Sequence, residues 1–139
     1  MKIYLFFIQF ISGLLGSLLF GFMGVIIGSF IGGNFDFPAF GGNVDYEAGG
    51  AFFAIVGISI GCLLGIRAIN KLFKKKQKYI IILIAAIITA FVGLALFNRN
   101  MPPITGLTIF LLPSAALTVV ANSQQFLKKI KFFNKNENR

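Results

Sequence analysis

Four long apolar segments, separated by short polar stretches, dominate the sequence. They cover approximately residues 3–32, 50–68, 79–97 and 103–124, and no Asp, Glu, Lys, Arg or His lies in the middle of any of them. A bilayer core about 30 Å thick is crossed by roughly 20 apolar residues in a helix. Since a helix satisfies its own backbone hydrogen bonds in lipid, the pattern predicts an all-α, polytopic integral membrane protein with four transmembrane helices.

Composition agrees with this class. Hydrophobic residues make up 57% of the chain and charged residues 12%, whereas a soluble domain carries about 25% charged residues. The first segment exceeds the apolar core of a signal peptide, about 7–15 residues, and no A-x-A cleavage site follows it. We therefore expect an uncleaved first span, a single transmembrane domain over residues 1–127 and a basic cytoplasmic tail over residues 128–139.

The placement of charge predicts how the chain is threaded, because Lys and Arg gather on the cytoplasmic side of membrane proteins. The stretch between the second and third segments reads RAINKLFKKKQK, and the tail reads FLKKIKFFNKNENR. By contrast, the stretch NFDFPAFGGNVDYEAGG between the first two segments has no Lys or Arg. We expect both termini in the cytoplasm and the acidic stretch outside, in a cytoplasmic (inner) membrane of bacterial type.

The net charge of +9 has two explanations. We favour membrane topology, since nearly all the basic residues border spans, and this border position also argues against nucleic acid as a partner. The alternative is specific contact with anionic phospholipid headgroups, which clusters of juxtamembrane lysines favour. The residues assigned to headgroup contact are Lys74, Lys75, Lys76, Lys78, Lys128, Lys129 and Lys131.

Small residues recur every third or fourth position in the first two segments, and this spacing keeps them on one helix face. Gly is unfavourable inside a helix in water, but in lipid small residues let two helix backbones approach closely. We expect the first two helices to pack on each other in this way, as in a glycine zipper; alternatively, one face meets a second copy or another subunit. The predicted packing positions are Gly13, Ser17, Gly21, Gly24, Gly28, Gly32, Gly57, Gly61 and Gly65.

The fourth segment contains Pro113, which removes one helical hydrogen bond and predicts a kink. We expect nearby hydroxyl groups, including that of Thr118, to bond to backbone carbonyls. Asn122 is expected near the inner interface, where water would satisfy its amide.

Residues that carry chemistry are few. The chain has no His and one Cys, Cys62, so the usual ligands of zinc and haem are lacking, and we expect no cofactor and no catalytic centre. Asp36, Asp45 and Glu47 are three of the four carboxylates. We expect them to solvate the outer loop, although a carboxylate pair can also act as acid and base or bind Ca²⁺.

These observations predict a membrane protein that is not an enzyme, most simply a structural or accessory subunit of a membrane complex. The alternative is a small homo-oligomeric channel or permease that uses the Pro113 kink and the hydroxyl groups of the fourth segment. The lipid bilayer is the expected environment, with a membrane-protein partner or further copies of the chain as candidates for assembly.

Overall fold

The structure is a computed structural model, which describes the backbone of residues 3–74, 79–98 and 100–137 and the side chains of residues 4–74, 79–98 and 100–123. The helices are α1 (Ile3–Asn34), α2 (Asp45–Leu72), α3 (Tyr79–Leu96) and α4 (Pro103–Glu137). Each contains a stretch long and apolar enough to cross a membrane. The predicted all-α fold with four transmembrane helices is therefore confirmed.

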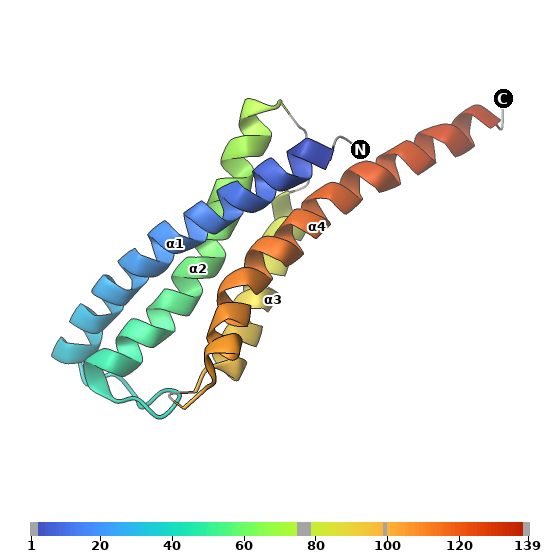
Figure 1. The fold of residues 1–139 in the computed structure, drawn as a ribbon. Coiled ribbons are helices and arrows are strands. Elements are labelled where there is room, and N and C mark those ends of the chain that lie inside the picture. The colour runs from blue at the N-terminus through green and yellow to red at the C-terminus, as the bar shows by residue number, and fades with distance from the viewer. Residues whose placement is uncertain (1–2, 75–78, 99, 138–139) are drawn as a thin grey trace.

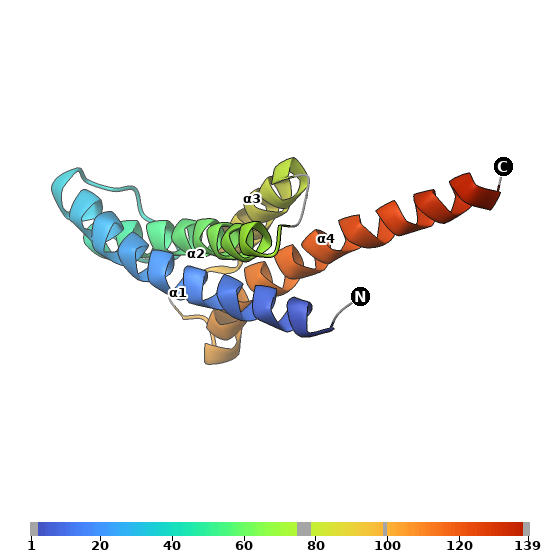
Figure 2. The ribbon, with the colours of Figure 1, turned by 90° about the horizontal axis from the view of Figure 1, so that it is seen from above.

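Consecutive helices run antiparallel, with α1 beside α2 and α3 beside α4 (Figure 1). One end of the bundle, here called the basic end, holds the start of α1, the end of α2 and the described basic residues Arg67, Lys71 and Lys74. The opposite end, the loop end, holds residues 35–44 and the connection between α3 and α4. The second half of α4 leaves the bundle (Figure 2), and α4 continues as one helix to Glu137.

The α1–α2 interface is built from backbone against backbone. At Gly28, an added Cβ would lie less than 3.0 Å from the carbonyl oxygen of Gly49, and at Gly61 it would lie less than 3.0 Å from that of Gly16. In both cases the relation is reciprocal, so each carbonyl faces the Cα–H group of the partner glycine. Eight glycines share this close approach, in which an added Cβ would lie less than 3.0 Å from a carbonyl oxygen of the other helix. They are Gly16, Gly24, Gly28, Gly32, Gly49, Gly57, Gly61 and Gly65.

Serine hydroxyls add direct bonds between the same two helices. Ser12 Oγ donates to the carbonyl oxygen of Gly65 at 2.9 Å, and Ser17 Oγ donates to that of Ile58 at 3.0 Å. The close packing of the first two helices through glycine, which the spacing predicts, is thus present in the structure.

The other two helices attach through side chains. A cluster of buried residues joins α2, α3 and α4, and its largest members from α2 and α4, Ile66 and Leu117, have no exposed surface. Within the described residues α1 and α3 share no contact, so α2 and α4 connect the two helix pairs. The members of this cluster are Cys62, Ile66, Ile82, Ala86, Leu117 and Ala121.

The loop end differs from its expected form because α2 begins at Asp45 rather than near residue 50. Asp45 and Glu47 therefore lie in the first helical turn, where negative charge is favourable against the helix dipole. The remaining loop is closed by a tight turn, in which Gly41 and Gly42 have φ values of 59° and 85° between the paired residues Phe40 and Asn43. Turns with two consecutive positive φ values require residues such as Gly.

Phenylalanines of the loop pack over the loop end of the bundle. The Phe40 ring stacks on that of Phe97 at the end of α3, with centroids 5.2 Å apart. Phe37 and Phe40 both contact Phe52 of α2, at 5.6 Å and 5.7 Å. These contacts tie the loop to both α2 and α3.

Candidate functional site

Three amide side chains meet at the basic end of the bundle, and we call them the amide cluster: Gln9 of α1, Asn70 of α2 and Asn122 of α4. Gln9 donates from Nε2 to Asn70 Oδ1, and its own Oε1 accepts from Asn122 Nδ2 at 2.7 Å. Gln9 and Asn70 have no exposed surface, and Asn122 is 4% exposed. The expectation that water satisfies Asn122 is therefore wrong, because this side chain points into the bundle and bonds to another helix.

The amide cluster is not fully satisfied. Among the described residues, Asn122 Oδ1 has no hydrogen-bond partner, and neither has the hydroxyl of Thr118, one turn earlier in α4. Thr118 was expected to bond to the backbone, so this expectation is wrong. Ser114 and Thr108 do bond to carbonyls of their own helix, those of Leu111 and Ile104, both at 2.8 Å. Pro113 itself is fully buried, and α4 passes through it without interruption.

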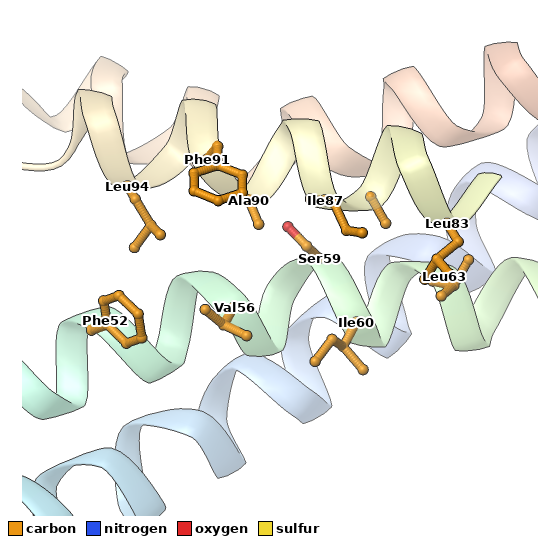
Figure 3. A pocket seen from close by; sticks show the side chains of 11 residues that line it. Phe52, Val56, Ser59, Ile60, Leu63, Leu83, Ile87, Ala90, Phe91 and Leu94 are labelled. Atoms are coloured by element: carbon orange, nitrogen blue, oxygen red, sulfur yellow. The ribbon is translucent and has the colours of Figure 1, made fainter. Parts of the chain in front are cut away.

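A second feature lies between α2 and α3, where the two helices leave an open apolar groove with a volume of about 450 Å³. We call it the α2–α3 groove. Its sides are large apolar residues and its polar lining is limited to Ser59. Figure 3 shows the Ser59 hydroxyl directed from α2 towards α3. Ser59 is 2% exposed, and its Oγ has no hydrogen-bond partner within the described part of the chain. Sites for small molecules have similar volumes, about 300–1,000 Å³, and combine an apolar lining with few polar groups.

The groove continues towards the basic end into a smaller hollow of about 160 Å³, since Leu63 and Leu83 line both. Arg67 and Tyr79 border this smaller hollow. The guanidinium carbon of Arg67 lies 5.1 Å from the centre of the Tyr79 ring, within the range of a cation–π contact. An apolar groove thus ends at a cationic and phenolic group.

The predicted packing residues lie at helix contacts. Gly13 faces Cys62 and Ile66 of α2 and also Ser114 of α4, with the nearest atom 3.1 Å from an added Cβ. Gly21 faces the Ile58 side chain. The predicted set lacks Gly16 and Gly49, which meet the carbonyl groups of Gly61 and Gly28.

The three carboxylates at the loop end, Asp36, Asp45 and Glu47, do not belong to a metal-binding group in the part of the chain that the structure describes. Asp36 and Asp45 are exposed and Glu47 is half-buried. Among the described residues, no group of three or more Cys, Asp or Glu side chains is arranged to hold a metal ion.

The predicted headgroup lysines are only partly covered by the structure. Lys74 is exposed directly after α2, with a φ of 51°. Lys75, Lys76 and Lys78 lie outside the described residues, as do the side chains of Lys128, Lys129 and Lys131 on the extension of α4.

In comparisons with models of known protein families, with curated proteins and with solved structures, no match to the chain was found. The features of this chain that bear on its function are the amide cluster, the α2–α3 groove and the distribution of charge.

Proposed function

We propose that this membrane protein is a non-catalytic accessory subunit of a membrane complex. The observation that carries the proposal is the use of its buried polar groups. Gln9, Asn122, Ser12 and Ser17 all bond to another helix, so they hold the bundle together. No Asp, Glu, Lys, Arg or His lies in the middle of the spans, although proton relays and ion sites in membranes depend on such groups.

The outward faces support a role in assembly. α1 presents a row of large apolar side chains away from α2, and several are more than half exposed: Leu15 at 65%, Phe22 at 67% and Phe30 at 69%. These faces suit lipid, and they equally suit the helices of a larger partner. The tight α1–α2 pair would give such a partner a rigid surface.

The experiment is purification of the tagged full-length chain from its native membrane in a mild detergent, followed by mass spectrometry of what elutes with it. We expect a defined partner in constant ratio, and no ion release when the isolated chain is reconstituted in potassium-loaded vesicles. A chain that elutes alone and yet releases potassium would refute the subunit proposal and support the alternative below.

The alternative is a small homo-oligomeric channel or permease. One observation favours it: the buried side-chain oxygen atoms of Ser59, Thr118 and Asn122 have no hydrogen-bond partner among the residues that the structure describes. Unpaired polar atoms are costly in an apolar interior and would be satisfied by a polar permeant. Potassium release that is abolished by Thr118→Val and retained in Thr108→Val would support this function.

For the orientation we propose that the basic end faces the cytoplasm, because Arg67, Lys71, Lys74 and the lysines of the α2–α3 connection gather there. Cysteine labelling tests this, since the native Cys62 is fully buried and contributes little background. In intact cells an impermeant maleimide should label Ala39→Cys, at an exposed loop position, and spare Lys74→Cys. The reverse pattern would refute the orientation.

A further inference from the structure

We propose that the α2–α3 groove binds one anionic phospholipid, with an acyl chain in the groove and the phosphate on Arg67 and Tyr79. The groove and the smaller hollow beside it adjoin each other. The large apolar section and the small hollow at Arg67 share Leu63 and Leu83 as lining residues. A single amphiphile can therefore occupy both, with its apolar part between α2 and α3 and its polar part at the basic end.

The positive charge of Arg67 favours an anionic ligand. Arg67 lies about 30 Å along α2 from Glu47, at about 1.5 Å per residue, and Asp36 and Asp45 lie at the same distant end. Three of the four carboxylates are thus far from the guanidinium. Arg67 is exposed and rests against the Tyr79 ring. Its N–H donors form no hydrogen bond to another described residue, so they can meet an anion. One guanidinium group can donate two parallel N–H···O bonds to a phosphate. Basic pockets between transmembrane helices also bind anionic headgroups.

The two ends of the groove differ in chemistry, and this difference fixes the direction in which a lipid lies. At the loop end the groove is bordered by Phe52, which is held by Phe37 and Phe40 of the loop. The cationic group lies at the other end. Head and tail of the lipid are therefore oriented by the fold, and the headgroup lies at the basic end of the bundle.

A lipid chain fits the groove better than a partner helix does. A helix of 18 residues and about 10 Å diameter would occupy on the order of 2,000 Å³, whereas the groove offers about 450 Å³. Apart from Ser59, the lining is apolar. Since an acyl chain gains little hydrophobic energy by moving from lipid to another apolar surface, we expect the headgroup contact to decide which lipid binds.

The test uses the purified full-length chain in mild detergent, titrated with dioleoyl phosphatidylglycerol or dioleoyl phosphatidylcholine, with retained lipid counted by native mass spectrometry. We expect one retained phosphatidylglycerol, bound about tenfold more tightly than phosphatidylcholine. Both lipids carry a phosphate, but the choline cation of phosphatidylcholine cancels its negative charge and repels Arg67, whereas phosphatidylglycerol keeps a net negative charge. Arg67→Gln should abolish this preference and Arg67→Lys should keep part of it. Lys71→Gln removes one charge one turn further along the same helix, from a residue that lines neither hollow, and should keep most of the preference that Arg67→Gln abolishes.

Two further pairs of variants test the groove itself. Ala90→Leu fills the groove and should reduce retention of both lipids at least threefold, whereas Ala95→Leu, exposed elsewhere on α3, should not. Ser59→Ala should leave retention unchanged, because an acyl chain offers its hydroxyl no partner.

The proposal is overturned if Arg67→Gln keeps the wild-type preference, if Ala90→Leu retains lipid like the wild type, or if Ser59→Ala loses the lipid. The last result would indicate an occupant that hydrogen bonds to Ser59, such as a partner helix. Arg67 is exposed, so its variants are expected to fold, and a matching elution volume checks this. The measurement needs no partner subunit, so its failure would leave the accessory-subunit proposal intact.

Discussion

The α1–α2 and α2–α3 interfaces share helix α2 but pack it in opposite ways. Towards α1, backbone meets backbone along Gly49, Gly57, Gly61 and Gly65, with no room for an added Cβ. Towards α3, side chains hold the helices apart and leave the α2–α3 groove. Helix pairs in lipid associate through close packing rather than through burial of apolar surface. The first interface is therefore expected to be a rigid joint, and the second a place where the occupant can change.

The largest effect is expected for the double variant Gly28→Leu with Gly61→Leu. At both positions an added Cβ would overlap a backbone carbonyl of the other helix, so the two helices must separate. Overpacking of this kind costs about 3 kcal/mol or more at each site. We expect the variant to lose its cooperative unfolding transition in detergent–SDS mixtures, followed by circular dichroism.

The matched control is Gly33→Leu with Gly106→Leu. An added Cβ there meets nothing closer than 3.7 Å and 3.5 Å, respectively. The control should unfold close to the wild type. If the double variant at Gly28 and Gly61 does so too, glycine packing is not what joins α1 to α2.

A single added methyl group sharpens the comparison. Gly61→Ala meets the backbone of Gly16, whereas Gly93→Ala on α3 meets side-chain methyl groups of Ile55 and Ile109 at 2.8 Å and 3.4 Å. Side chains shift more readily than backbone, so we expect Gly61→Ala to lower the free energy of unfolding by about 2–3 kcal/mol and Gly93→Ala by about 1 kcal/mol or less. Equal losses, measured by the same SDS titration, would contradict the contrast between the two interfaces.

The amide cluster should give an intermediate effect. Gln9→Leu removes the buried hydrogen bonds to Asn70 and Asn122, which is expected to cost about 1–2 kcal/mol. The double variant Gln9→Leu with Asn122→Leu should cost less than the sum of the two single variants, because the atoms that pair with each other leave together. Simple additivity would show that the bond between these two side chains contributes nothing.

The smallest effect is expected at the groove. Ala90 is half-buried and faces open space in the α2–α3 groove, so Ala90→Leu should change the free energy of unfolding by less than about 0.5 kcal/mol. The same substitution is expected to displace lipid. A large loss of stability would indicate that α2 and α3 are closely packed there, contrary to the structure.

Much of the fold could be predicted from the sequence because each part is a local signal. The four spans follow from length and hydropathy, and the glycine face follows from helical spacing. Two details depend on tertiary geometry. The predicted helix face does not include Gly16, because the spacing that defines it starts from Gly13. In the structure Gly13 faces α4 as well as α2. Asp45 and Glu47 were assigned to the loop because polar residues end an apolar run, although acidic residues also begin helices.

The amide cluster could not be predicted from spacing. Its members lie 61 and 113 residues apart in the bonded pairs, and a neutral amide has no sequence pattern that names its partner. The available signal was Gln9 itself, since a polar side chain within an apolar run needs a partner in another helix. The groove had no signal at all, because it results from how far α3 stands from α2.

The rigid joint also bears on how the protein is made. Its contacts run from Ser12 to Gly65, so the entire joint is present in the chain before α3 and α4 have been synthesised. Chains are built from the N-terminus at about 5–20 residues per second, which gives this hairpin a few seconds in which it can close alone. Helices α3 and α4 would then pack against an α1–α2 pair that has already formed. A substitution at one of the glycines would therefore disturb the packing of α1 on α2 before α3 and α4 are made.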